Sequence, residues 1–135
     1  MLTIDWRRPK RSSDGSRASG RTRMPANAPT DTVVQQFLQD KLDLINRIYA
    51  PKRLIVFGSR ATGQAHEESD IDLIVVSEKF ADVRYPNRMG NFLIDIDPDV
   101  HVDALCYTPE EFDRALHAQS SFVRDAVANG LEILH

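Results

Sequence analysis

Residues 53–76 read RLIVFGSRATGQAHEESDIDLIVV, with two short apolar runs on either side of a polar connection. The runs Arg53–Phe57 and Ile71–Val76 are rich in β-branched residues and are bounded by turn residues, so we expect each to form a β-strand. Gly58 and Ser59 leave the first strand at a turn, where backbone N–H groups and a hydroxyl suit a phosphate. The stretch therefore predicts strands joined through a phosphate-binding turn.

Two aspartates stand on either side of Ile71, at positions 70 and 72. Side chains alternate between the faces of a strand, so the carboxylates of Asp70 and Asp72 project on the same side and can share a cation. Two ionised carboxylates this close repel each other when no cation is bound. Hard oxygen ligands favour Mg²⁺, with Mn²⁺ as an alternative, and Mg²⁺ takes its remaining ligands from water and substrate phosphates.

A third carboxylate is needed if a second cation is to activate an attacking hydroxyl. Asp103 is the best candidate because it lies inside the apolar stretch VHVDALC at residues 100–106, where an unpaired carboxylate is costly without a ligand. The competing run, DIDPD at residues 95–99, is interpreted as a solvated loop, since Pro98 cannot take part in a strand ladder. The alternative for Asp103 is a charge at a strand end that reaches solvent.

The spacing of these motifs resembles that of a known family. Residues 58–63 (GSRATG), residues 69–73 (SDIDL), and Val102-Asp103 followed by TPEEF at residues 108–112 are similar to motifs of the minimal nucleotidyltransferases of the DNA polymerase beta superfamily. The resemblance covers residues 33–135 and implies the polymerase beta-like nucleotidyltransferase fold.

The resemblance also implies roles for individual residues. It assigns triphosphate binding to Gly58 and Ser59, both metal ions to Asp70 and Asp72, and the catalytic metal ion to Asp103. Arg60 follows the Gly-Ser pair and is a further candidate for binding the nucleotide. The alternative for Arg60 is a surface position on a short helix.

Helical spacing and capping residues predict the remaining elements. Asp31 or Thr30 caps a helix over residues 33–49. Further helices are expected at residues 60–65 and 85–96 and after the capping box that begins at Thr108, and residues 131–135 form a short edge strand. The fold class is therefore α/β, a small mixed sheet of three to four strands with helices packed mainly on one face. The three aspartates lie on the opposite face, as the floor of an open cleft.

The charge divides the chain into two parts. Residues 1–30 hold seven Arg or Lys against two Asp, a net charge of +5, so residues 31–135 carry −8 of the total of −3. We predict a disordered basic tail at residues 1–30 and one nucleotidyltransferase domain at residues 31–135. The tail is interpreted either as an arm for RNA, DNA or an acidic partner or as an extension ahead of an alternative start at Met24.

Composition excludes several other classes. The 135 residues are 41% hydrophobic and 27% charged, which suits one domain with one core. No apolar run approaches the ~20 residues of a membrane span, so we expect no membrane association and a cytoplasmic location. The single cysteine, Cys106, excludes an intrachain disulfide and a multi-cysteine zinc site.

The function predicted from these features is Mg²⁺-dependent transfer of a nucleoside monophosphate, AMP from ATP, from a nucleoside triphosphate to a hydroxyl acceptor with release of pyrophosphate. The chain has little beyond the core, so the acceptor is expected on a partner. The resemblance implies a HEPN-type toxin, with this protein as its antitoxin. One alternative is a catalytically silent antitoxin that acts by binding alone, which three mutually repelling carboxylates argue against. Another is a terminal nucleotide transferase using the basic tail, which the acidic domain argues against.

Overall fold

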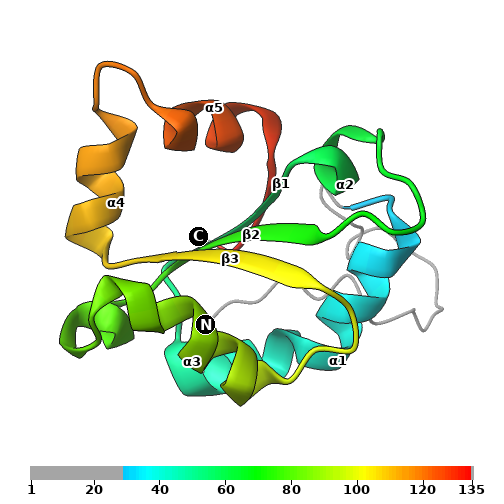
Figure 1. The fold of residues 1–135 in the computed structure, drawn as a ribbon, viewed down its shortest axis with the longest axis horizontal. Coiled ribbons are helices and arrows are strands. Elements are labelled where there is room, and N and C mark those ends of the chain that lie inside the picture. The colour runs from blue at the N-terminus through cyan, green and yellow to red at the C-terminus, as the bar shows by residue number, and fades with distance from the viewer. Residues whose placement is uncertain (1–28, 135) are drawn as a thin grey trace, which may run out of the picture.

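The computed structural model describes residues 29–134 (Figure 1). The predicted basic tail therefore lies outside the described residues except for positions 29 and 30, and Met24 and His135 lie outside them too. The elements in chain order are α1 (Thr32–Tyr49), β1 (Arg53–Phe57), α2 (Ser59–Thr62), β2 (Ile71–Val76), the 3-10 helix η2 (Glu78–Asp82), α3 (Tyr85–Ile96), β3 (Val102–Tyr107), α4 (Pro109–Leu116), α5 (Phe122–Asn129) and β4 (Leu131–Leu134).

The strands form one mixed sheet in the order β3-β2-β1-β4. β1 is antiparallel to both β2 and β4, whereas β2 and β3 run parallel. In this register Asp72 lies opposite Phe57 on one side and opposite Asp103 on the other. The predicted α/β fold with a small mixed sheet is confirmed, and within residues 29–134 the sheet has four strands.

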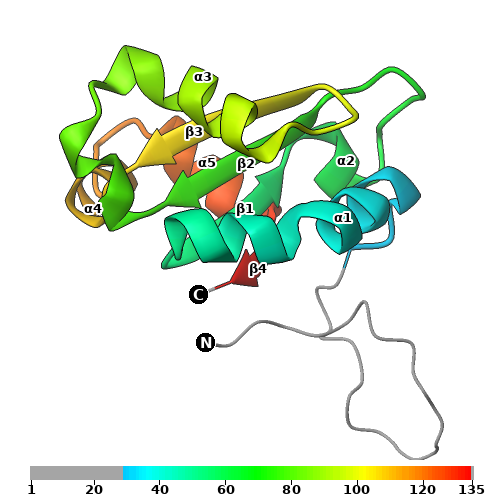
Figure 2. The ribbon, with the colours of Figure 1, turned by 90° about the horizontal axis from the view of Figure 1, so that it is seen from below.

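Helices α1 and α3 cover one face of the sheet (Figure 2). Helix α1 begins where predicted, because the Asp31 carboxylate accepts hydrogen bonds from the backbone N–H groups of Val33 and Val34 at 2.9 and 3.0 Å. Its apolar stripe is buried against the strands, and apolar burial of this kind is the main favourable term in folding. The stripe consists of Val34, Phe37, Leu38, Leu42 and Ile45.

Helices α4 and α5 cover part of the other face (Figure 1). They bury Ile55, Ile74 and Val76 of the strands beneath Phe112 and Val123. The prediction of helices mainly on one face is correct for α1 and α3 but omitted this second layer. Its physical cause is the apolar run of β1 and β2, which places hydrophobic side chains on both faces and so requires cover on both.

A buried arginine joins α3 to β3 and α4. Arg88 donates to the backbone carbonyls of Val83 and Cys106 at 2.8 and 3.2 Å, and both of its terminal nitrogens donate to the Glu111 carboxylate. Glu111 also completes the predicted capping box with Thr108. None of the helices within residues 29–134 has the length and apolar character of a membrane span.

Candidate active site

The turn after β1 packs directly against a carboxylate. Gly58 has a φ of 77°, which favours glycine, and a Cβ at this position would collide with Oδ2 of Asp72. Any larger residue would therefore displace the Asp72 side chain. Ser59, the first residue of α2, is half-buried, and within residues 29–134 its hydroxyl makes no hydrogen bond. The turn thus places the backbone of Gly58 close to the Asp72 carboxylate, with the Ser59 hydroxyl next to it in sequence.

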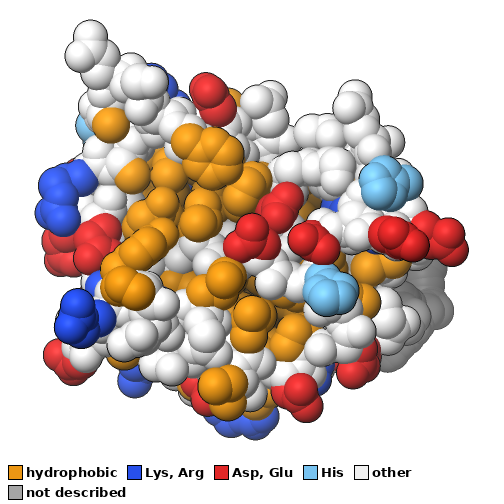
Figure 3. All heavy atoms as spheres, in the orientation of Figure 1, with side chains coloured by type: hydrophobic (Ala, Val, Ile, Leu, Met, Phe, Trp, Pro, Cys, Tyr) orange, Lys and Arg blue, Asp and Glu red, His pale blue; other side chains and the backbone are white. Residues whose placement is uncertain are grey.

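The three predicted aspartates lie at one end of the second face. Asp72 of β2 stands in register with Asp103 of β3, and neighbouring parallel strands lie about 4.8 Å apart. Asp70 immediately precedes β2. Acidic side chains gather near the centre of this face, next to a hydrophobic area (Figure 3). The structure therefore places Asp72 beside both Asp103 and the Gly58 turn, with Asp70 two residues before it, while the roles of the three aspartates stay a prediction.

The three carboxylates interact electrostatically. Asp70 and Asp103 are exposed, while Asp72 is half-buried. The pKa of Asp72 is raised from its ordinary value, first by burial and then by the negative charges of Asp103 and Asp70. Burial and the charges of Asp103 and Asp70 thus disfavour the ionised form of Asp72, and a divalent cation bound beside it would remove that penalty.

The donor set fits a divalent cation that keeps an open coordination sphere. All three side chains offer hard oxygen ligands, which suit Mg²⁺ or Mn²⁺. Among the described residues, no group of three or more His, Cys, Asp or Glu side chains is arranged so that it could hold a metal ion by itself. That is compatible with Mg²⁺, which binds through one or two carboxylates and completes its shell with water and phosphate oxygens. The metal roles of the three aspartates remain predictions.

A cavity of about 510 Å³ lies on the other side of Asp70. Its walls come from residues 67–70 and 99–101, together with Val33 and Arg60. The carboxylates of Glu67, Glu68, Asp70 and Asp99 make this cavity unfavourable for a triphosphate. The Gly58–Ser59 turn therefore remains the better candidate for the phosphates.

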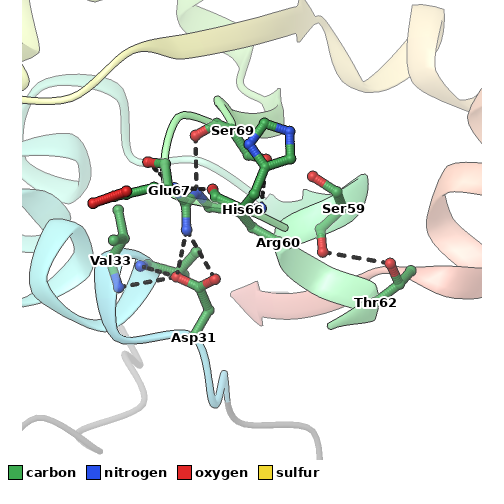
Figure 4. Close-up of polar contacts among 9 residues, drawn as sticks. Asp31, Val33, Ser59, Arg60, Thr62, His66, Glu67 and Ser69 are labelled. Atoms are coloured by element: carbon green, nitrogen blue, oxygen red, sulfur yellow. Dashed lines mark hydrogen bonds and ion pairs between the residues drawn. The ribbon is translucent and has the colours of Figure 1, made fainter. Parts of the chain in front are cut away.

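The structure corrects the prediction that Arg60 binds the nucleotide. Arg60 is only 7% exposed, and all three of its guanidinium nitrogens donate hydrogen bonds to neighbouring groups (Figure 4). Nε donates to the carbonyl of Ser69 at 3.0 Å, Nη2 to the carbonyls of His66 and Glu67 at 3.2 Å, and Nη1 to both carboxylate oxygens of Asp31. Because the guanidinium is buried and engaged through all three nitrogens, Arg60 contributes to the architecture around the site.

Sequence reasoning missed the second role of Asp31. Its carboxylate caps α1, as predicted, and also pairs with Arg60 at 3.0 Å. The two residues are 29 positions apart, and no local pattern links an N-cap residue to an arginine in a later helix. Only the packing of α1 beside α2 brings them together.

Comparison with known proteins identifies the class to which this fold and site belong. Residues 38–131 match the sequence model of the nucleotidyltransferase domain, a range that includes the Gly58 turn and all three aspartates. Since this is more than half of the chain, the protein belongs to the nucleotidyltransferase domain family.

One solved structure is also similar to the chain. It is a crystal structure from Sulfolobus solfataricus whose own assignment as a nucleotidyltransferase is provisional. The two chains share 23% sequence identity with a TM-score of 0.44, over 62% of this chain and 70% of the other. No curated protein sequence matches the chain.

Proposed function

We propose that this protein is a Mg²⁺-dependent enzyme that transfers a nucleoside monophosphate, AMP from ATP, to a hydroxyl group of an acceptor. The observation that carries the proposal is the contact between the Gly58 turn and Asp72, which itself lies in register with Asp103. A phosphate-binding turn and the carboxylates for metal ions therefore share one site. Membership of the nucleotidyltransferase domain family supports the reaction type.

In this proposal, different residues of the site bind the triphosphate and the divalent cations. Gly58 and Ser59 bind the triphosphate through backbone N–H groups and a hydroxyl, while Asp70, Asp72 and Asp103 hold divalent cations. Divalent cations held by these carboxylates would supply charge neutralisation for the phosphates and activation of the acceptor hydroxyl. In the transfer, the acceptor oxygen bonds to the α-phosphorus, the bond from that phosphorus to the bridging β-oxygen breaks, pyrophosphate leaves and the hydroxyl proton is released. Catalysis then rests on alignment and charge stabilisation.

The acceptor in this proposal is a partner protein. Residues 29–134 form one sheet with its helices and contain no second domain for an acceptor. These residues carry a net charge of −8, which favours a partner with basic surface and disfavours nucleic acid. Following the family resemblance, we assign the partner as a HEPN-type ribonuclease toxin and this protein as a cytoplasmic antitoxin. A nucleic-acid partner would require the basic tail.

The test is a direct transfer experiment. The full chain is incubated with the candidate partner, ATP and Mg²⁺, and the partner is weighed by intact mass spectrometry. Each transfer of AMP with loss of pyrophosphate should add about 329 Da. The double variant Asp70→Asn/Asp72→Asn and a reaction in EDTA should give no gain. If the double variant silences the partner as well as the wild type does, with no mass change under any nucleotide, the protein acts as a binding antitoxin and the catalytic proposal is wrong.

A further inference from the structure

Arg60 connects three segments that are separate in the sequence. Its guanidinium contacts the N-cap residue of α1, the residue that precedes Asp70, and the turn at residues 66–67 (Figure 4). The side chains of Arg60 and Asp31 are 6% and 17% exposed. Charge-assisted hydrogen bonds in such a buried setting are costly to break, because breaking them leaves a buried charge without its partner. The Arg60 contacts therefore fix these three segments relative to one another.

The segment that Arg60 fixes leads directly to a candidate metal ligand. Ser69, whose carbonyl accepts from Arg60, also closes the turn: its N–H donates to His66 O at 2.9 Å and its hydroxyl accepts from the His66 N–H at 3.0 Å. The next residue is Asp70, and Ile71 then enters β2 with its N–H bonded to the carbonyl of His101. Asp70 is exposed. The placement of its backbone thus depends on the turn that Arg60 holds.

We propose that Arg60, anchored on Asp31, is a positioning residue that sets the location of the Asp70 carboxylate and thereby the affinity of the site for a divalent cation. The inference rests on the proposed function, because it takes Asp70 as a metal ligand. Groups that orient metal ligands without touching the metal often affect binding by about 10–100-fold.

The chemistry of the side chain explains why arginine is needed here. Lysine has the same charge but presents three donors from one point, whereas the guanidinium directs five donors toward acceptors on three segments. Arg60→Lys therefore keeps the positive charge near the site but removes the planar guanidinium with its divergent N–H donors. Asp31→Asn keeps a good N-cap for α1 and removes the ionic partner of Arg60. The two variants separate positioning from long-range charge and from helix capping.

A matched control exists elsewhere in the molecule. Arg88 is also buried, donates to two backbone carbonyls and forms a two-pronged pair with a carboxylate, but it lies between α3 and α4. Arg88→Lys therefore makes the same chemical change in a similar environment away from Asp70. Glu67→Gln controls for loss of one negative charge near the site, because only the backbone carbonyl of Glu67 contacts Arg60.

The experiment measures Mn²⁺ binding to the full chain by electron paramagnetic resonance, with and without a non-hydrolysable ATP analogue. Arg60→Lys should weaken Mn²⁺ binding by about tenfold or more. Asp31→Asn should weaken it by more than Glu67→Gln does. Arg88→Lys should lower the thermal midpoint but leave Mn²⁺ affinity within about twofold of wild type. Hydrogen exchange at the Ser69 amide should accelerate in Arg60→Lys and stay unchanged in Arg88→Lys.

The outcomes separate this inference from the proposed function. If the wild type binds Mn²⁺ more tightly than Asp70→Asn does, and Arg60→Lys matches the wild type, the positioning role is wrong while the metal site stands. If Arg60→Lys and Arg88→Lys weaken Mn²⁺ binding equally, Arg60 contributes only to general stability and the inference is overturned. If the wild type and Asp70→Asn bind Mn²⁺ equally poorly, the metal site is wrong and the inference falls with it.

Discussion

Asp72 and Ile74 lie two residues apart on β2 and point to the same face of the sheet, yet their surroundings differ sharply. Ile74 is fully buried beneath α4 and α5. Asp72 is half-buried between Asp103 and the Gly58 turn, with its pKa raised by burial and by neighbouring negative charge. The half of this face beneath α4 and α5 thus stabilises the fold. The half that carries the aspartates is less favourable for stability and forms the candidate active site.

The boundary between the two halves of this face follows the chemistry of the strand side chains. Covering the whole face with helices would bury three carboxylates without partners, which is unfavourable. Leaving it all open would expose Ile55, Ile74 and Val76 to water. The second helical layer stops where the apolar side chains of the strands give way to aspartates. Variants on the two sides of that boundary should therefore affect different properties.

The largest effect is expected on the uncovered side. Asp103→Asn should reduce nucleotidyl transfer by about a thousandfold or more while nucleotide affinity stays near that of the wild type, because Asp103 is assigned to activation of the acceptor. Asp70→Asn should impair both, since Asp70 is assigned to both metal ions. Single-turnover transfer and calorimetric titration of ATP with Mg²⁺ measure the two properties. Near wild-type turnover in Asp103→Asn would move the third ligand elsewhere, with the aspartates of residues 95–99 next to be tested.

On the covered side, Ile74→Ala should lower the free energy of unfolding by about 2–5 kcal/mol, because it opens a cavity between β2 and the α4–α5 layer. Urea unfolding followed by circular dichroism measures the loss. Mn²⁺ affinity under native conditions should remain near that of the wild type. A large loss of Mn²⁺ affinity in a folded Ile74→Ala protein would show that the two halves of the face are not independent.

The boundary could be read partly from the sequence. Asp70, Asp72 and the Gly58–Ser59 turn form a local pattern whose period places them on one face, and Asp103 stands out as a charge in an apolar strand. The capping box at Thr108 and the N-cap at Asp31 are also local, and both are confirmed. Local patterns were enough because each of these features is set by residues within a few positions of each other.

The missed features depend on contacts between distant segments. The α4–α5 layer is needed because β2 carries apolar residues on both faces. The sequence shows this in the continuous apolar run of residues 73–76. The polar and apolar alternation around Asp72 instead suggested a strand with only one buried face. The buried positions of Arg60 and Arg88 had no such signal, because their carbonyl and carboxylate partners come together only through packing. From the sequence, Arg60 is a natural candidate for a phosphate ligand because it follows the Gly58–Ser59 turn. Only the structure shows that its guanidinium instead contacts Asp31 and the carbonyls of the following turn.

Acidification should weaken the covered side through Glu111. The pKa of Glu111 is lowered, chiefly by its hydrogen bonds from Arg88. A lowered pKa in the folded state means that the ion pair stabilises the protein above the ordinary glutamate pKa and that this contribution is lost as the pH falls through the folded-state value. Glu111→Gln keeps the capping box and should cost about 1–2 kcal/mol at pH 7, a value reduced by the partial exposure of the carboxylate.

The measurement is urea unfolding of the wild type and of Glu111→Gln at several pH values. The difference between them should shrink as the pH drops below about 4.5. Glu110→Gln, one residue earlier and exposed, serves as the control and should show little change at any pH. A difference that stays constant into acid would mean that the ion pair with Arg88 does not stabilise the fold.

The smallest effect, and the one with opposite sign, is expected at Asp72. Burial and the charges of Asp103 and Asp70 raise the pKa of Asp72 and so disfavour its ionised form, so Asp72→Asn should stabilise the protein without metal. Like charges facing each other on adjacent strands cost about 0.2–1 kcal/mol, which corresponds to a rise of about 1–5 °C in the thermal midpoint of a domain of this size. Differential scanning calorimetry in EDTA measures it, with Asp82→Asn as the control.

Saturating Mg²⁺ and nucleotide should reverse the order of the two thermal midpoints, because only the wild type gains the stabilisation that ligand binding provides. A lower midpoint for Asp72→Asn in EDTA would mean that the carboxylate stabilises the empty fold, and the division of this face into a stabilising half and a functional half would have to be abandoned.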